Sequence, residues 1–181
     1  KREDTALAGI SIGAYTALIN GLLRPDRFGS IIALSGAFMR DRVLEAVESH
    51  SPRKRKYYER WFGNLDTVIG SEKDYVTLID RFKQDPELPK PRFYGACGEH
   101  DNLCGNNREV VGLLKEAGFD VTYWEPEIGS HEWPFWNAWI DCALDWYAPG
   151  EMKPSSANVD YTGITSLRPP DEGKFVLKDN D

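Results

Sequence analysis

Apolar residues along this chain follow two patterns, and their alternation predicts an α/β fold. Short apolar runs typical of strands in a parallel sheet occur at residues 6–8, 30–34, 93–98 and 121–124. Apolar residues at helical spacing follow three of these runs, at residues 14–23, 109–117 and 133–147. This alternation favours a mainly parallel sheet flanked by helices. Because crossovers between parallel strands are right-handed, the loops that follow the strands should lie at one edge of the sheet.

Residues 37–90 interrupt the alternation. This segment is charged and irregular, with helical pieces at residues 41–48 and 72–82. It is too long for a plain loop, so we expect an inserted helical cap over the site. The basic run from Arg53 to Lys56 is typical of a solvated helix start, and less so of an anchor for an acidic substrate group. Residues 149–181 are polar, contain Pro and Gly throughout and lack periodicity, which predicts an extended tail.

Length and composition fit one globular domain. The chain has 181 residues, of which 41% are hydrophobic and 28% charged, values that are ordinary for a soluble protein with a sizeable core. We expect this domain to span residues 1–148, including the cap. The core side of its last helix should carry five residues, namely Trp136, Ile140, Ala143, Leu144 and Tyr147.

Charge and cysteine content limit the partners and the location of the chain. The net charge of −7 argues against nucleic acid and against an anionic membrane surface as partners. No apolar stretch approaches the length of a membrane span, and no signal-peptide pattern opens the chain. The three cysteines are most simply free thiols in a reducing compartment, so we expect a cytoplasmic location.

Cys97, His100 and Cys104 have a spacing that could indicate a zinc site. The spacing is loose compared with structural zinc sites. Asp101 lies inside it and has a better use as a partner of a catalytic base. We therefore expect no metal and no other cofactor.

Gly9-Ile10-Ser11-Ile12-Gly13 is the most informative motif of the chain. This G-x-S-x-G element lies between an apolar run and a helical pattern, the context in which such a motif forms a sharp turn with an outward serine hydroxyl. We expect Gly9 and Gly13 to be required because a side chain at either position would collide with neighbouring backbone. The N-terminus of the following helix points at Ser11, so the backbone N–H of Ile12 should donate to an oxyanion formed there.

Asp101 and His131 are the candidates to activate Ser11. A serine hydroxyl needs a base to take its proton, and the base needs a group that fixes its tautomer. Both residues follow predicted strands, and the chain order Ser, Asp, His is that of α/β-hydrolases. His100 adjoins Asp101 on the loop, so it should be structural or face solvent. Glu99 could replace Asp101 as the acid if the loop were shifted.

These motifs make the chain similar to the putative esterase family of α/β-hydrolases, and most of all to its tributyrin-esterase-like branch. The family also includes acetyl esterases, the esterase D and S-formylglutathione hydrolase branch, feruloyl esterases and mycolyltransferases. The resemblance covers residues 1 to about 148, and its motifs are Ala8–Tyr15, Pro25–Gly29, Trp61–Leu65, Cys97–Asp101 and Gly129–Trp136. It implies an α/β-hydrolase fold of which this chain holds the C-terminal part, with Ser11, Asp101 and His131 as a catalytic triad.

The resemblance also implies a function, namely a serine carboxylesterase that hydrolyses short-chain acyl or acetyl esters through an acyl-enzyme. An S-formylglutathione-type thioesterase or an acyltransferase stays open, because the triad does not dictate the substrate or the nucleophile that deacylates the enzyme. A non-catalytic binding module is an alternative of another class. We expect Trp133, Trp61 and Tyr58 to bind the small-molecule ester, while many of the other aromatic side chains fill the core.

Two departures from the family pattern matter. Ala14 stands where the family commonly has a second glycine, and its methyl group should narrow the turn slightly. The family also has several strands and helices before its serine motif, which correspond to roughly a hundred residues. We therefore expect a C-terminal part of a longer enzyme, without the loop that supplies a second oxyanion donor. Alone it should be poorly active or unstable, and its expected partner is the missing N-terminal half or another copy in a homo-oligomer.

Overall fold

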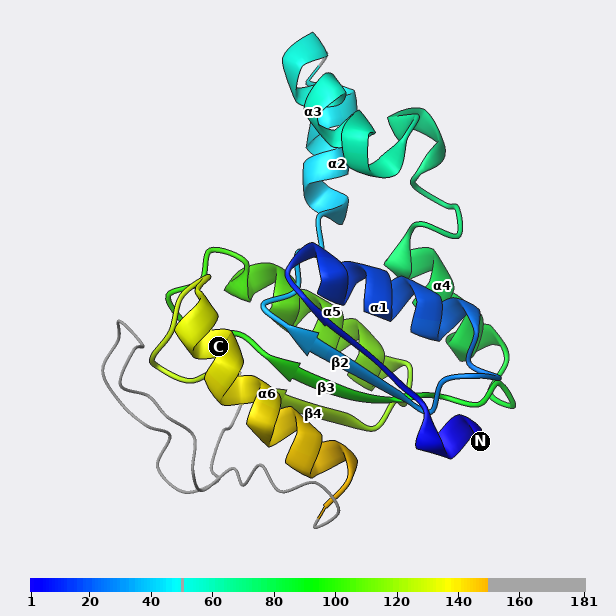
Figure 1. Cartoon of the computed structure of the whole chain (residues 1–181). Coiled ribbons are helices and arrows are strands. Elements are labelled where there is room, and N and C mark those ends of the chain that lie inside the picture. Colours follow the sequence, from blue (N-terminus) through cyan, green and yellow to red (C-terminus); the bar gives the residue numbers. More distant parts are fainter. Residues whose placement is uncertain (50, 150–181) are drawn as a thin grey trace.

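Four parallel strands form the centre of the molecule (Figure 1). The computed structural model describes residues 1–49 and 51–149, so the tail expected over residues 149–181 lies outside it beyond the first residue. The strands are β1 (Ala6–Ile10), β2 (Ser30–Leu34), β3 (Arg92–Ala96) and β4 (Val121–Trp124). Their order across the sheet equals their order in the chain, and all neighbours are parallel. The carboxyl ends of the strands therefore share one edge, and the predicted parallel α/β fold is confirmed.

Helices cover both faces of this sheet. In the described part of the chain, α1 (Ile12–Leu23), α4 (Tyr75–Gln84) and α5 (Cys104–Glu116) pack on one face, and α6 (Trp133–Tyr147) packs on the other (Figure 1). Strand β2 shows why both faces need cover, because all five of its residues are buried. Ile31 and Ala33 belong to the core under α1, whereas Ile32 and Leu34 belong to the core under α6. Since successive strand residues point to opposite faces, one short apolar run supplies both cores.

The side of α6 that faces the sheet agrees with the prediction only in part. Its buried residues are Phe135, Trp136, Ala138, Trp139 and Ala143. The prediction is correct for Trp136 and Ala143. Ile140 and Tyr147 are half-buried and pack against the same core, whereas Leu144 is half-buried and does not belong to it. α6 is apolar around most of its circumference, so spacing alone does not fix its rotation. The rings of Phe135 and Trp139 share a buried cluster with Ile32 and Tyr94 of the sheet, and this packing decides the orientation.

A second helical unit stands out from the sheet (Figure 1). We call it the cap, and it consists of α2 (Arg40–Glu48), α3 (Pro52–Phe62) and the 3₁₀ helix η2 (Leu65–Thr67). It has a small core of its own, made of Val43, Ala46, Phe62, Leu65 and Val68. Helix α4 lies inside the range 37–90 but packs against α1 in the main core. The segment therefore contains both the cap and a helix of the main body.

Helix α3 begins at the basic run that the sequence singles out. The Ser51 side chain accepts a hydrogen bond from the Lys54 N–H, and Pro52 occupies the first helical position. Both features are typical of a helix N-terminus. Arg53, Lys54 and Lys56 are exposed, so the run is a solvated helix start as predicted.

β1 lies at an edge of the sheet, after the short 3₁₀ helix η1 (Arg2–Asp4). Its residues are at most half-buried and Ala8 is exposed, whereas β2 beside it is buried throughout. Within residues 1–49 and 51–149, no other strand pairs with the outer side of β1. This edge therefore has less cover than the rest of the sheet.

Candidate active site

Ser11 occupies a strained turn between β1 and α1. Its backbone has φ 55° and ψ −120°, a conformation that is uncommon for a residue with a side chain and typical of functional sites. The Ser11 N–H donates to the Leu34 carbonyl over 2.9 Å, and the Ser11 carbonyl accepts from the Ala37 N–H over 3.0 Å. Both partners lie at or just after the end of β2. The neighbouring strand end therefore fixes the sharp turn that the G-x-S-x-G motif predicts.

The two glycines of the motif have different roles. A Cβ atom at Gly9 would lie 2.1 Å from the Gly13 carbonyl oxygen, so the turn excludes any side chain there. A Cβ atom at Gly13 would meet nothing within 4 Å, so the collision predicted at that position is wrong. The direction from Gly13 opens into free space beside α1. Ala14 is fully buried in the main core, which accommodates its methyl group by packing.

Ile12 is the first residue of α1, directly after Ser11. The N–H groups of a first helical turn have no carbonyl partner within the helix. The positive end of the helix macrodipole lies at the same point. The position suits an oxyanion donor, and this role of Ile12 stays a prediction.

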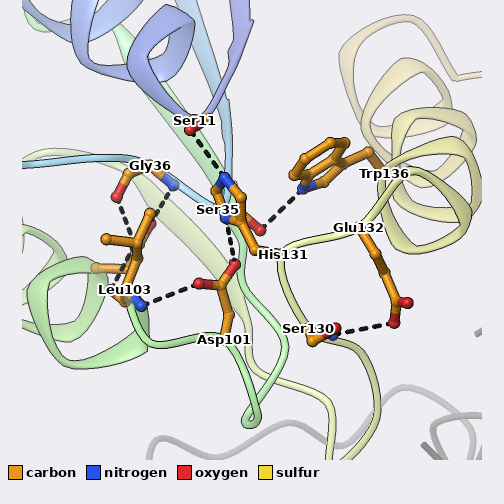
Figure 2. A network of polar contacts seen from close by, with 10 residues as sticks. Ser11, Ser35, Gly36, Asp101, Leu103, Ser130, His131, Glu132 and Trp136 are labelled. Carbon is orange, nitrogen blue, oxygen red and sulfur yellow. Dashed lines mark hydrogen bonds and ion pairs between the residues drawn. The ribbon is translucent and has the colours of Figure 1, made fainter. Parts of the chain in front are cut away.

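His131 joins Ser11 to Asp101 through two hydrogen bonds (Figure 2). The distance is 2.9 Å from His131 Nε2 to Ser11 Oγ and 2.9 Å from His131 Nδ1 to Asp101 Oδ2. One tautomer satisfies both bonds: Nδ1–H donates to the carboxylate, and Nε2 accepts from the serine hydroxyl. The Asp101 side chain is fully buried, and its other oxygen accepts from the Leu103 N–H over 2.9 Å. The structure thus brings together the three residues that the sequence predicts at this sheet edge.

The loops that carry Asp101 and His131 lie against each other. The Glu99 N–H donates to the Pro126 carbonyl over 2.9 Å, which ties the loop after β3 to the loop after β4. A Cβ atom at Gly98 would lie 2.2 Å from a backbone oxygen of the second loop, so only glycine permits this approach. The relative position of the acid and the base is therefore set by backbone contacts.

The neighbours of Asp101 do not compete with it. Glu99 and His100 are both exposed, whereas Asp101 is buried. It is the Asp101 carboxyl that bonds the imidazole of His131. The alternative in which Glu99 is the acid is not supported, and His100 faces solvent, one of the two placements expected for it.

A second strained serine and a buried tryptophan support the imidazole. Ser35 follows β2 with φ 46°, and its hydroxyl accepts a hydrogen bond from the Trp136 indole N–H over 3.0 Å (Figure 2). The Trp136 ring stands edge-on to the His131 ring, with centroids 4.9 Å apart. Trp136 is predicted in the core, but the sequence does not reveal the role of Ser35. The only signal is a Ser-Gly pair directly after an apolar strand, at the edge where the triad loops lie.

The three aromatic residues predicted to bind substrate lie in two places. The Trp133 ring stands edge-on to Trp136, with centroids 5.2 Å apart, and Trp133 is 66% exposed. It therefore lies beside the triad. Tyr58 and Trp61 belong to α3; Tyr58 packs partly against the core of the cap, and Trp61 is 55% exposed. Both residues belong to α3 of the cap, which stands out from the sheet in Figure 1, and their role in substrate binding stays a prediction.

Other chemistry near this edge is limited. In residues 1–49 and 51–149, no group of three or more His, Cys, Asp or Glu side chains is placed to hold a metal ion. Cys97 and Cys104 are buried beside the Asp101 loop. A hydrogen bond with the Cys104 thiol, together with burial, raises the pKa of the Cys97 thiol, so this thiol stays protonated.

Among the helices of residues 1–49 and 51–149, none is long and apolar enough to cross a lipid bilayer.

The chain matches known proteins over the region that carries this site. The sequence model of the family described as "Putative esterase" matches residues 1–146. An acetyl esterase of Caldicellulosiruptor saccharolyticus is 40% identical over 148 residues, which are 81% of this chain and 55% of that protein. The chain thus spans about half the length of the curated relatives it matches.

Two solved structures from Staphylococcus aureus have a similar fold. The S-formylglutathione hydrolase FrmB matches with a TM-score of 0.63, and the fluorophosphonate-binding serine hydrolase FphF matches with a TM-score of 0.65. Each is 26% identical to this chain, and each match covers 81% of this chain and 55% of the other. The α/β-hydrolase fold that the resemblance implies is confirmed.

Proposed function

Because this chain belongs to the putative esterase family, we propose that it is a serine carboxylesterase that acts on short-chain acyl or acetyl esters through an acyl-enzyme. The observation that carries the proposal is the chain of hydrogen bonds from Ser11 Oγ through His131 to the Asp101 carboxylate, each 2.9 Å long. Acyl transfer by a serine requires a nucleophile, a base within hydrogen-bond reach of it and a group that orients the base. The three side chains supply one of each.

In the first half-reaction, Ser11 Oγ attacks the ester carbonyl carbon. Its proton passes to His131 Nε2, which already accepts the hydroxyl hydrogen bond. The electron pair of the carbonyl bond moves to the carbonyl oxygen, and the Ile12 N–H donates to this oxyanion. When the carbon–oxygen double bond re-forms, the bond to the alcohol oxygen breaks. The imidazolium gives its proton to the departing alcohol and leaves an acyl group on Ser11.

In the second half-reaction, water replaces the alcohol. His131 Nε2 takes a proton from the water as its oxygen attacks the acyl carbon, and the Ile12 N–H again faces the oxyanion. The bond to Ser11 Oγ then breaks, Ser11 regains its proton from the imidazolium, and the carboxylic acid departs. The Asp101 carboxylate orients the imidazole and stabilises the imidazolium, a task that suits a buried carboxylate held by the Leu103 N–H.

The substrate class rests on the relatives and on one exposed side chain. The relative from Caldicellulosiruptor saccharolyticus is an acetyl esterase, which supports a small acyl group. Trp133 offers an apolar surface next to the triad through its contact with Trp136, so it lines the place where a small ester binds. Tyr58 and Trp61 would add to this surface only through movement of the cap.

A thioesterase of the S-formylglutathione type is the second candidate. The solved structure of FrmB, an S-formylglutathione hydrolase, supports it at 26% identity. The chemistry at Ser11 is the same for a thioester, except that the departing group is a thiol. Comparing kcat/KM for p-nitrophenyl acetate and S-formylglutathione separates the two. A higher value for the acetate supports the ester, and a higher value for the thioester supports the alternative.

Active-site labelling tests the proposal most directly. A fluorophosphonate probe should react with the chain, and mass spectrometry should find the adduct on the peptide that contains Ser11. Ser11→Ala should abolish labelling. Ser71→Ala, which changes a serine whose hydroxyl bonds the Val68 carbonyl in the turn before α4, should leave labelling unchanged. An adduct elsewhere, or none at all, would contradict the proposal, and the absence of any adduct would favour a non-catalytic binding module.

A further inference from the structure

Asn107 is a polar residue in an otherwise apolar stripe. It lies on α5 at helical spacing with Val110, Val111 and Leu114, all of which are buried under the sheet. Asn107 itself is only 2% exposed. Burying an amide is unfavourable unless its hydrogen bonds are made. Its partners therefore indicate why an amide occupies this position.

The Asn107 amide joins two loops of the active-site edge. Its Oδ1 accepts from the Gly36 N–H over 3.0 Å, and its Nδ2 donates to the Gly36 carbonyl over 2.8 Å. The same Nδ2 donates its second hydrogen to the Leu103 carbonyl over 2.8 Å. Both donors of the amide and its acceptor are thus used. Gly36 belongs to the loop after β2, and Leu103 belongs to the loop after β3.

The first of these loops leads to Ser11 and His131. Gly36 lies between Ser35 and Ala37 in the chain. The Ala37 N–H donates to the Ser11 carbonyl over 3.0 Å. Ser35 accepts from Trp136, whose ring stands against His131 (Figure 2). A displacement of Gly36 would therefore also move Ser11, through Ala37, and the Trp136 ring that stands against His131, through Ser35.

The second loop leads to Asp101. The Leu103 N–H donates to Asp101 Oδ1 over 2.9 Å, as Figure 2 shows. The carbonyl of the same residue accepts from Asn107. Leu103 therefore links the two side chains: its N–H holds Asp101, and its carbonyl is held by Asn107.

We propose that Asn107 is a positioning residue that sets the separation between Ser11 and Asp101, so that His131 bonds both at once. The two nitrogens of an imidazole are at a fixed distance on a rigid ring, so both 2.9 Å bonds require a fixed separation of their partners. Asn107 touches none of the reacting atoms and acts through the two loops. The proposal rests on the function proposed above, because it presupposes that the triad performs acyl transfer.

The test compares Asn107→Leu with Asn106→Leu. Both variants exchange an asparagine of α5 for a leucine, but Asn106 is not fully buried and has no side-chain hydrogen bond among the described residues. We expect Asn107→Leu to lower kcat for p-nitrophenyl acetate and the rate of fluorophosphonate labelling by about 10²-fold, since small displacements of catalytic groups have effects of this size. KM should stay nearly constant, and Asn106→Leu should behave like the unchanged chain.

A second arm separates positioning from folding stability. In a Ser11→Ala background, Asn107→Leu should have no further effect on residual hydrolysis, because the triad it positions is already broken. Equal labelling rates for Asn107→Leu and the unchanged chain would overturn the inference while Ser11 labelling kept the proposed function intact. Failure of the unchanged chain to label at Ser11 would instead remove the proposed function itself.

A near-isosteric variant covers the case in which Asn107→Leu does not fold. Asn107→Asp retains an acceptor for the Gly36 N–H but places a second oxygen against the Gly36 and Leu103 carbonyls. We expect a folded protein by near-ultraviolet circular dichroism with slower labelling. If neither variant folds, Asn107 is needed for the fold as such, and the inference is overturned.

Discussion

The main body and the cap differ in how well they are packed and in what they contribute to the candidate site. The body packs a sheet between α1, α4 and α5 on one face and α6 on the other, and its two buried clusters hold most of the core. The cap has a core of five buried residues and exposes most of α3. All three triad residues come from strand-end loops of the body, and none comes from the cap. The positions of the three candidate catalytic side chains are thus fixed by the sheet of the body. The cap contributes none of them, so changes in its surface or position need not disturb their geometry.

One group of hydrogen bonds around the Asp74 carboxylate, which we call the joint, connects the body to the cap. Asp74 is buried where the chain returns from the cap, and its carboxylate accepts from Arg40 Nε at the start of α2 over 3.0 Å. The same carboxylate accepts from the Gly70 and Val76 N–H groups and from the Thr77 hydroxyl. Both ends of the cap segment are therefore held by one side chain. The comparison predicts that damage to the body abolishes chemistry, whereas damage to the joint reduces stability.

The largest effect is expected for Ser11→Ala. Removing the nucleophile should lower kcat by about 10⁴- to 10⁶-fold. The free energy of unfolding should hardly change, because the hydroxyl bonds the His131 imidazole at the surface of the molecule. Ester hydrolysis under saturating substrate and denaturant unfolding measure the two quantities. Full activity in this variant would remove the body from its catalytic role.

Asp101→Asn should rank second. The amide can no longer hold the Nδ1–H tautomer of His131, and kcat should fall by about 10³- to 10⁴-fold. Glu99→Gln is the matched control, because Glu99 is an exposed acid on the same loop. It should keep the activity of the unchanged chain. A stronger loss in Glu99→Gln than in Asp101→Asn would show that the loop adopts another register during turnover.

Asp74→Ala should reduce stability more than chemistry. Loss of a buried carboxylate that bonds Arg40 and three further donors should lower the free energy of unfolding by about 3 kcal/mol. At a temperature where the protein stays folded, kcat should change less than about ten-fold. Asp26→Ala is the control, since Asp26 forms an exposed pair with Arg24, and its Tm should not change measurably. A loss of kcat as large as that of Asp101→Asn would mean that cap and triad are one unit.

Variants of the two exposed tryptophans, Trp133 and Trp61, should show whether the body or the cap binds the substrate. Trp133→Ala should raise KM by several-fold up to about ten-fold, because it removes an apolar surface beside the triad. Trp61→Ala and Tyr58→Ala should change KM by less than about two-fold, since surface substitutions away from a site have small effects. Steady-state kinetics with p-nitrophenyl esters measures this. A larger KM effect for Trp61 would place the cap over the substrate during turnover.

The smallest effect is expected from thiol modification. Burial raises the pKa of Cys142 on α6 to about 11, so its thiolate is scarce at pH 8 and increases only as the pH rises toward that value. Iodoacetamide at pH 8 should therefore alkylate it slowly and leave the esterase rate unchanged. Intact-protein mass spectrometry follows the modification. Rapid alkylation with loss of activity would show that the α6 face of the body opens readily.

Strong local patterns explain which elements are predictable. The strand at residues 30–34 and the helix at residues 133–147 have the predicted bounds. A short apolar run defines the strand, and Pro134 near the start and Pro149 after the end limit the helix. Helix α5 begins at Cys104, whereas the sequence predicts it only from residue 109. The prediction began late because the first turn contains two asparagines and a glycine, which are weak helix formers. The meeting of Ser11, Asp101 and His131 is predictable because parallel strands bring their ends to one edge of the sheet, while the exact distances depend on contacts between the loops.

Two features of the candidate site needed three-dimensional packing. The rotation of α6 is hidden because aromatic residues surround it, although Asn137, Asp141 and Asp145 mark the less apolar side at helical spacing. Asn107 leaves a clearer signal, as a polar residue at an apolar position of α5. Its partners could not be inferred, because they are backbone groups that lie 71 and 4 residues away.

The agreement between spatial and chain order also bears on synthesis. A ribosome releases β1 and α1 before the other described elements, and each later strand can dock on the one made just before it, with a modest entropy cost of loop closure. Ser11 is then present early, while the imidazole at position 131 arrives only with α6. If the proposed function holds, the Ser11 hydroxyl therefore lacks its base until all four described strands have been made.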